Sequence, residues 1–355
     1  MSNWVTQQSK STSQEEYQRK YPLESRRALR YHGAMSRPQF QDTCLLERRN
    51  NYDVTNQVIT TDPAAVNGEV NRIFVELYPG ASTHVLNRAF KDLARLHHGD
   101  YPGYRACDTG YHNLQHTLDV TLAMARLMDG HERSPDRGDA LGSRLFGFGV
   151  VTALFHDIGY LRRASDTRHK NGAEYTLKHI TRGARFLEEY LSELGMAKLA
   201  LAASRIIHFT GYERPVHKIR VPNPTFRLLG NLLGTADIIA QMADRCYLEK
   251  CRDRLFPEFV EGGLAARNED DHRASVQFKS AEDLVVKTPT FYRTAMARLN
   301  DQLGRTYRYA ETHFGGRNLY IEAIDRNIQF ATEVAKQRDL SLLRRSPPRP
   351  DDKSG

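Results

Sequence analysis

Apolar residues recur at three- and four-residue spacing along most of this 355-residue chain, and this helical period is the feature that most limits its possible folds. Residues 114–128 carry apolar side chains one turn apart and contain neither Gly nor Pro. No stretch alternates apolar and polar residues for long enough to predict a β-strand. We therefore predict an all-α fold, with helices over residues 66–78, 89–98, 114–128, 141–155, 174–194, 197–208, 226–255, 291–313 and 318–338.

The periodic region is bounded by two polar segments. Residues 1–66 are rich in Gln, Ser, Arg and Asn and show little periodicity, so we expect an extension that is partly disordered or lies over the core. Residues 67–340 are predicted to form one helical domain. Residues 341–355 are rich in Pro and Arg and are predicted to be a disordered tail.

Composition restricts the cellular setting and the partners. The N-terminus has no apolar run of the kind a secretory signal needs, and the longest apolar run is interrupted by His156 and Asp157. The four cysteines form no CxxC pair and are typical of buried thiols in a reducing compartment, so we predict a cytoplasmic protein that does not enter a membrane. Lys and Arg outnumber Asp and Glu by 51 to 43, which indicates an anionic partner. The basic runs are short, and we do not expect nucleic-acid binding.

Histidines and aspartates at the ends or within apolar helical stretches are the strongest functional signal. Four segments carry them: Tyr111-His112-Asn113-Leu114-Gln115-His116, Phe155-His156-Asp157-Ile158-Gly159, Lys178-His179 and Ile207-His208. A fifth is Asp237, a single acid within an apolar helix. The four-residue spacing of His112 and His116 predicts that both lie on one helical face. The other histidines, including His131 and His313, are expected at the surface or at helix ends.

Burying such residues is costly without a compensating partner. A charged or polar side chain moved into an apolar interior loses several kcal/mol of hydration. A bound metal ion compensates for this loss, and a carboxylate beside an imidazole offers both an oxygen that can bridge two ions and a nitrogen donor. The segments are separated by helical lengths of chain, as in metal sites built inside helical bundles. A buried His–Asp hydrogen-bonded pair is the alternative interpretation of His156 and Asp157.

The order of these residues resembles the HD superfamily of metal-dependent phosphohydrolases, whose pattern is H…HD…D. His116, His156-Asp157 and Asp237 match that pattern. Tyr111-His112-Asn113-x-x-His116, followed by Asp119-Val120, is similar to the YHNxxHAxDV signature of class I cyclic-nucleotide phosphodiesterases. The HDIG element and His179 also resemble the HD-GYP branch. That branch has a lysine where this chain has Tyr160 and a paired histidine where it has Ile207-His208, and both differences argue against cyclic di-GMP as the substrate.

The resemblance covers about residues 93–249 and implies an HD-type helical bundle with a buried site for two divalent metal ions, from among Mn, Mg, Zn and Fe. The implied ligands of the first ion are His116, His156, Asp157 and Asp237. Asp157 would bridge to a second ion, held also by His179 and His208. A metal-activated hydroxide would attack phosphorus, and His112 would protonate the leaving alkoxide. The implied activity is hydrolysis of a small phosphorylated substrate, preferably a cyclic nucleotide or a related phosphodiester.

Three further residues near the motifs are weaker candidates. Glu174 could orient a water or a metal ligand, and Lys170 and Arg162 could receive phosphate. A surface acid and a solvated loop are the alternatives for these side chains. Other activities also fit the ligand order: a nucleotide phosphomonoesterase, a di-iron oxygenase of the myo-inositol oxygenase type, or a degenerate HD domain that acts as a sensor or scaffold.

Overall fold

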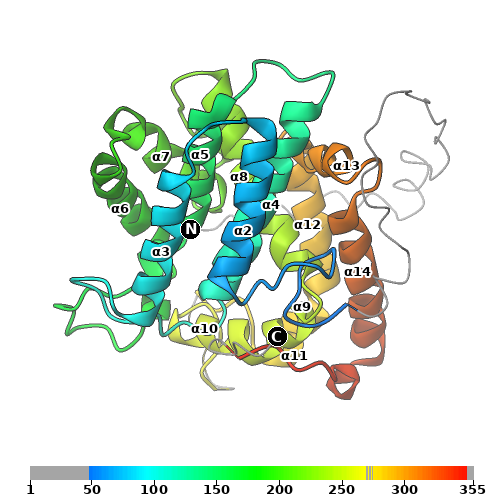
Figure 1. Cartoon of the computed structure of the whole chain (residues 1–355). Coiled ribbons are helices and arrows are strands. Elements are labelled where there is room, and N and C mark those ends of the chain that lie inside the picture. Colours follow the sequence, from blue (N-terminus) through cyan, green and yellow to red (C-terminus); the bar gives the residue numbers. More distant parts are fainter. Residues whose placement is uncertain (1–47, 269–270, 272, 274, 350–355) are drawn as a thin grey trace. The chain divides into compact units, whose positions relative to one another are not determined.

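The computed structural model describes residues 48–268, 271, 273 and 275–349, and these residues form an all-helical structure (Figure 1). Within them, β-structure is confined to three isolated bridges. No helix in these ranges is both long and apolar enough to cross a membrane. The α-helices are α2 (Pro63–Leu77), α3 (His84–His98), α4 (Leu114–Arg133), α5 (Gly142–Leu154), α6 (His179–Glu193), α7 (Ala200–Ile206), α8 (Pro224–Ala243), α9 (Tyr247–Lys250), α10 (Phe256–Glu261), α11 (Ala281–Val286), α12 (Thr288–Asp301), α13 (Tyr309–His313) and α14 (Leu319–Gln337).

Helix α4 is the centre of the core. Nearly every residue from Leu114 to Glu132 is buried, and the helix packs against α2, α5, α8 and α13 (Figure 1). Its contact with α13 is close: a Cβ at Gly130 would overlap the backbone of Tyr309. The helix also buries polar side chains, and these have partners: Arg126 pairs with Asp53, and Asp129 pairs with His313.

Several of the predicted helices are interrupted in the structure. The stretch 291–313 is divided into α12, a 3-10 turn over Thr306–Arg308, and α13. The stretch 226–255 ends as an α-helix at Ala243, resumes as α9, and continues through a π-helical turn over Cys251–Leu255. The stretch 174–194 begins with a 3-10 turn over Gly172–Tyr175, and α6 starts only at His179. The prediction of surface histidines is wrong at two positions. His131 is 1% exposed, and His313 is nearly buried, with its Nδ1 2.6 Å from Asp129 Oδ2.

The segment before α2 is ordered over its described part. Asp53 accepts hydrogen bonds from the backbone N–H groups of Thr55, Gln57 and Val58, and it pairs with the buried Arg126 of α4 at 2.6 Å. These bonds fold the segment onto the core although it has no helical period. Helix α2 begins at Pro63, three residues before the predicted helix start at 66, and the Asp62 side chain caps its N-terminus. Residues 1–47 of the predicted extension lie outside the described residues.

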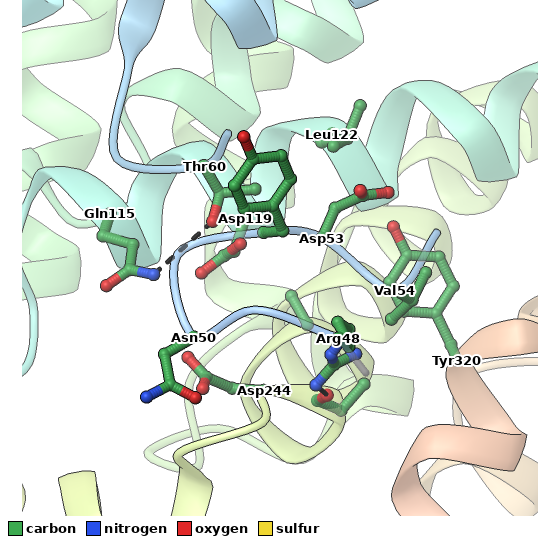
Figure 2. A pocket seen from close by; sticks show the side chains of 13 residues that line it. Arg48, Asn50, Asp53, Val54, Thr60, Gln115, Asp119, Leu122, Asp244 and Tyr320 are labelled. Atoms are coloured by element: carbon green, nitrogen blue, oxygen red, sulfur yellow. Dashed lines mark hydrogen bonds between the residues drawn. The ribbon is translucent and has the colours of Figure 1, made fainter. Parts of the chain in front are cut away.

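A small polar cavity of about 20 Å³ lies where this segment meets α4 and α8 (Figure 2). Asp53, Asp119, Asp244 and Arg48 line it, and Gln115 Nε2 donates to Thr60 Oγ1 at 3.4 Å beside it. The space accommodates about one water molecule. It is therefore too small for an organic ligand.

The C-terminal segment also packs on the core as far as residue 349. Leu343 is buried, and the Arg345 guanidinium donates to the Arg245 carbonyl at 2.6 Å. The Asn50 amide donates to the Ser346 carbonyl at 3.0 Å, which joins the two polar segments to each other. Long-range hydrogen bonds thus order the part of the predicted tail that is described, and residues 350–355 lie outside it.

Candidate metal centre

Three helices and the loop after α5 bring most of the predicted ligands together. His116 lies in the first turn of α4, where the Asn113 side chain accepts a hydrogen bond from the His116 backbone N–H at 3.2 Å. His156 and Asp157 directly follow α5, His179 is the first residue of α6, and Asp237 lies within α8. His112 precedes α4, so the prediction that it shares a helical face with His116 is wrong. The two rings are nevertheless adjacent, with centroids 5.5 Å apart.

The first group consists of two imidazoles and two carboxylates. The Nε2 atoms of His116 and His156 lie 3.2 and 3.1 Å from Asp157 Oδ2. The same nitrogens lie 3.5 and 4.0 Å from Asp237 Oδ1. Neither Nε2 atom has a hydrogen-bond partner of acceptable geometry within the described part of the chain, although both are buried. Nitrogens and oxygens that converge in this way without hydrogen bonding suit a shared cation.

His179 approaches the other oxygen of Asp157. Its Nε2 lies 3.5 Å from Asp157 Oδ1, so the two carboxylate oxygens face different histidines. The exposed fraction of the side chains rises from 1% for His156 to 16% for Asp237 and 17% for His179. Solvent therefore reaches the centre from the side of Asp237 and His179.

The electrostatics of the group favour a positive charge at its middle. Burial alone would raise the pKa of Asp157, but the adjacent His156 and His116 outweigh it and hold that pKa well below its usual range. Burial likewise lowers the pKa of His156, and the carboxylates of Asp157 and Asp237 outweigh it and raise this pKa to about 9. A divalent cation would satisfy the same carboxylates and would displace protons from the imidazoles.

Hydrogen bonds at the opposite ring nitrogen orient these histidines. His156 Nδ1 donates to the Ala153 carbonyl at 2.8 Å, and His179 Nδ1 donates to the Thr176 carbonyl at 2.7 Å. A carbonyl oxygen can only accept, so Nδ1 carries the proton and Nε2 keeps its lone pair when the ring is neutral. This arrangement is typical of histidines that bind metals through Nε2.

His112 has a buried carboxylate partner that the sequence did not predict. Glu258 of α10 is 4% exposed, forms an ion pair with His112 Nδ1, and accepts the Tyr111 backbone N–H at 2.9 Å. Burial lowers the pKa of His112, but Glu258, Asp157 and Asp237 outweigh it and raise this pKa to about 9. His112 therefore holds a proton at neutral pH beside the first group. No spacing signal links residues 112 and 258, since they come from different parts of the chain.

Tyr160 connects His112 with His179. Its ring stacks on His112 with centroids 4.4 Å apart and planes 13° apart, and on His179 at 4.3 Å and 18°. At 2% exposure, Tyr160 forms part of the buried wall of the centre. The Tyr160 ring thus fixes the planes of two imidazoles.

The loop after Asp157 is held tightly against α6. A Cβ at Gly159 would overlap the His179 carbonyl oxygen, so only glycine permits this close approach. Arg182 Nε and Nη2 donate to the carbonyls of Gly159 and Leu161, both at 2.7 Å. These contacts fix the position of His179 relative to Asp157.

Four predicted residues lie outside this group of side chains. His208 Nδ1 pairs with Glu213 Oε1 at 2.6 Å, and in the described ranges His208 makes no ion pair or ring contact with Asp157 or His179. Glu174 accepts the Lys170 backbone N–H at 2.8 Å, and the Lys170 side chain is exposed. Arg162 donates to Asp108 Oδ2 at 2.9 Å and to the His169 carbonyl at 3.0 Å, so it braces the loop.

Glu213 interacts with both His208 and His179. Burial alone would raise the pKa of the Glu213 carboxyl, but His208 and His179 outweigh it and lower this pKa. Sequence reasoning missed both Glu213 and Glu258. Glu213 lies in a polar stretch, where acids are common on protein surfaces. Glu258 lies between Phe256-Pro257 and Phe259-Val260, an apolar setting that could have marked it as buried.

Comparison of the chain with models of protein families, with curated proteins and with solved structures finds no match.

Proposed function

We propose that this protein is a metal-dependent phosphohydrolase that cleaves a small phosphoester, preferably a cyclic nucleotide or a related phosphodiester. The observation that carries the proposal is the position of Asp157 between two sets of histidines, with Oδ2 toward His116 and His156 and Oδ1 toward His179. A carboxylate in this position is suited to bridge two cations. The unpartnered Nε2 atoms of His116 and His156 and the mixed nitrogen and oxygen donors fit divalent metal ions.

In this proposal His116, His156, Asp157 and Asp237 hold one ion, while Asp157 and His179 hold a second. Two such ions acidify a water and neutralise phosphoryl oxygens, which is the chemistry that phosphoester hydrolysis requires. His208 would reach the second ion only after releasing Glu213, and we assign it no ligand role.

His112 is the proposed general acid. Its Nδ1 is bound to Glu258, which leaves Nε2 as the nitrogen able to donate a proton to a leaving alkoxide. Glu258 and the stacked ring of Tyr160 hold the imidazole in place during that transfer. The preference for a phosphodiester rests on the YHNxxH resemblance, in which the first histidine has this role.

The test combines metal analysis with a phosphoester panel. We expect the purified protein to contain two divalent ions per chain and to hydrolyse at least one of cyclic AMP, cyclic GMP, a dinucleotide or a nucleoside monophosphate. His156→Ala and Asp157→Ala should lose metal and more than about a hundredfold of the activity. His169→Ala, which removes a histidine outside the centre, should retain both.

Three results would refute the proposal. Wild-type metal content in both His156→Ala and Asp157→Ala would show that these residues do not bind the metal. Activity that survives full chelation would remove the metal requirement. Bound iron with substrate-dependent oxygen consumption would assign the centre to the oxygenase class instead.

A further inference from the structure

A second cavity lies between α3, the loop that follows α3, and α6. Its volume is about 540 Å³, which is within the range of small-molecule sites. None of the proposed metal ligands lines it. It is therefore separate from the candidate centre, and any ligand that it binds would be additional to the substrate.

One wall of this cavity is aromatic and buried. Tyr104, Phe186 and Tyr190 are each less than 10% exposed, and Tyr104 meets Phe186 edge to face with centroids 5.9 Å apart. Tyr101 extends the wall, at 6.1 Å from Tyr104. Rings arranged in this way offer a planar ligand both stacking and edge-to-face contacts.

Three half-exposed arginines line the same cavity and retain donors. Arg88 Nη1 donates to the Glu193 carbonyl at 3.2 Å, and Arg95 Nη2 donates to the Asp100 carbonyl at 3.1 Å. Arg163 makes one long ion pair, with Glu189 at 3.5 Å. Each guanidinium has five N–H donors, so several remain for a ligand.

The charged residues that line the cavity favour a ligand with one anionic group over a ligand with several. Asp92 is buried and is shared by Arg88 at 3.6 Å and Arg95 at 3.5 Å, so at this point one carboxylate faces two guanidinium groups. Glu189 and Glu193 are exposed and add negative charge where the cavity opens. A polyanion would meet these acids, whereas a ligand with a single anionic group would not.

We propose that this cavity is a binding site for a small ligand with a planar aromatic ring and one anionic group. The guanidinium groups of Arg95 and Arg163 lie over the Tyr101 and Tyr104 rings at 5.3 and 4.3 Å, so the ligand ring packs beside these arginines on the aromatic wall while the arginines bind the anion. The same wall contacts Phe155, the residue before His156, with ring centroids 5.2 Å from Phe186 and 4.5 Å from Tyr190. The site thus adjoins the residue that precedes the proposed ligands His156 and Asp157.

The test is calorimetric titration of the full chain with AMP and GMP as probes, with ATP as the polyanionic comparison. We expect His156→Ala, in which the proposed metal centre is removed, to bind one molecule of AMP or GMP per chain, and to bind it more tightly than ATP. Arg163→Ala and Tyr101→Ala should each weaken binding by at least about tenfold. Arg185→Ala, an equal loss of charge on the outer side of α6, should change it by less than about twofold.

The outcomes separate this site from the proposed function. Binding that disappears in His156→Ala would place the probe at the metal centre and overturn the inference. Equal weakening of binding by Arg163→Ala and Arg185→Ala would mean that the probe is held by general charge attraction and would overturn the proposed site. Absence of binding by both monophosphates at millimolar concentration would also overturn the proposed site. Unfolding curves confirm that each variant is folded. None of these results depends on whether the chain hydrolyses a phosphoester.

Discussion

At the scale of single residues, the oxygen bound at Nδ1 distinguishes the histidines of the centre from one another. His156 and His179 use backbone carbonyls, which are neutral, whereas His112 uses the carboxylate of Glu258. A neutral partner leaves an imidazole free to lose its second proton and bind a cation. An anionic partner stabilises the protonated ring, which suits an acid. The hydrogen bonds therefore agree with the roles proposed for these residues.

The first prediction concerns this acid. His112→Ala should keep its metal content but lose about 10²–10⁴-fold in kcat, and Glu258→Gln should lose about 10–100-fold. Both losses should shrink for nitrophenyl esters, whose leaving group needs no proton. Steady-state kinetics on both substrate types provides the measurement, and Glu174→Gln is the matched control outside the centre. Equal losses on good and poor leaving groups would contradict the assignment of His112.

The residues of the centre differ in how far the sequence could predict them. His116, His156, Asp157, His179 and Asp237 lie in or beside apolar helices, where an uncompensated polar group is too costly to be incidental. Glu258 pairs with His112, 146 residues away, and Glu213 pairs with His208, five residues away, and neither spacing is a pattern that identifies a partner from sequence. His208 lies in an apolar stretch, as the proposed metal ligands do, yet its partner is Glu213. Burial identifies a residue that needs a partner but does not say which partner it has.

At the scale of elements, the periodic pattern located the long helices within a few residues of α2, α4, α5 and α14. It failed where tertiary contacts interrupt a helix. The break after Ala243 is held by Asn327 of α14, whose amide donates to the carbonyls of Met242 and Asp244 at 2.8 and 2.7 Å. An interruption set by a residue so far along the chain leaves no local signal.

The second prediction concerns the packing of the loop after Asp157 on α6. Gly159→Ala should lower the free energy of unfolding by about 1–3 kcal/mol, because the added methyl overlaps the His179 carbonyl and Arg182 holds the loop in place. Gly68→Ala is the matched control: it lies in α2 with nothing within 4 Å of the new Cβ, and should raise stability by about 0.5–1 kcal/mol. Urea unfolding measures both, and equal effects would contradict the close approach.

At the scale of the whole described molecule, the described parts of the two polar segments pack on the helical core beside each other, near residues 243–245. The sequence predicted them as disordered or peripheral, because neither has a hydrophobic period. Their order comes instead from specific polar contacts, chiefly Asp53 with Arg126 and Arg345 with the Arg245 carbonyl. Such contacts depend on partners far along the chain, and composition alone does not reveal them.

The third prediction concerns the pH dependence of stability at the small cavity. Burial and Asp244 raise the pKa of Asp119 from 3.8 to about 7, against the attraction of Lys250 and Arg48. Between these two values the folded state binds more protons than the unfolded state, so this carboxyl makes stability fall as pH rises from about 4 to 7. Asp119→Asn should remove that contribution and gain stability over the wild type at pH 8 more than at pH 5.

Thermal unfolding at both pH values measures this difference. Asp136→Asn, which removes an exposed carboxylate, provides the control and should follow the wild-type profile. Parallel pH profiles for the wild type and Asp119→Asn would contradict the raised pKa.

The hydrogen bond from Asn50 to the Ser346 carbonyl has a consequence for how the fold opens. Segments near the ends of a folded chain commonly fray first, and each usually does so independently. Here each segment provides part of the other's binding surface, so loosening one removes partners from its counterpart. We expect the two segments to exchange their amide protons as one cooperative unit rather than independently of each other.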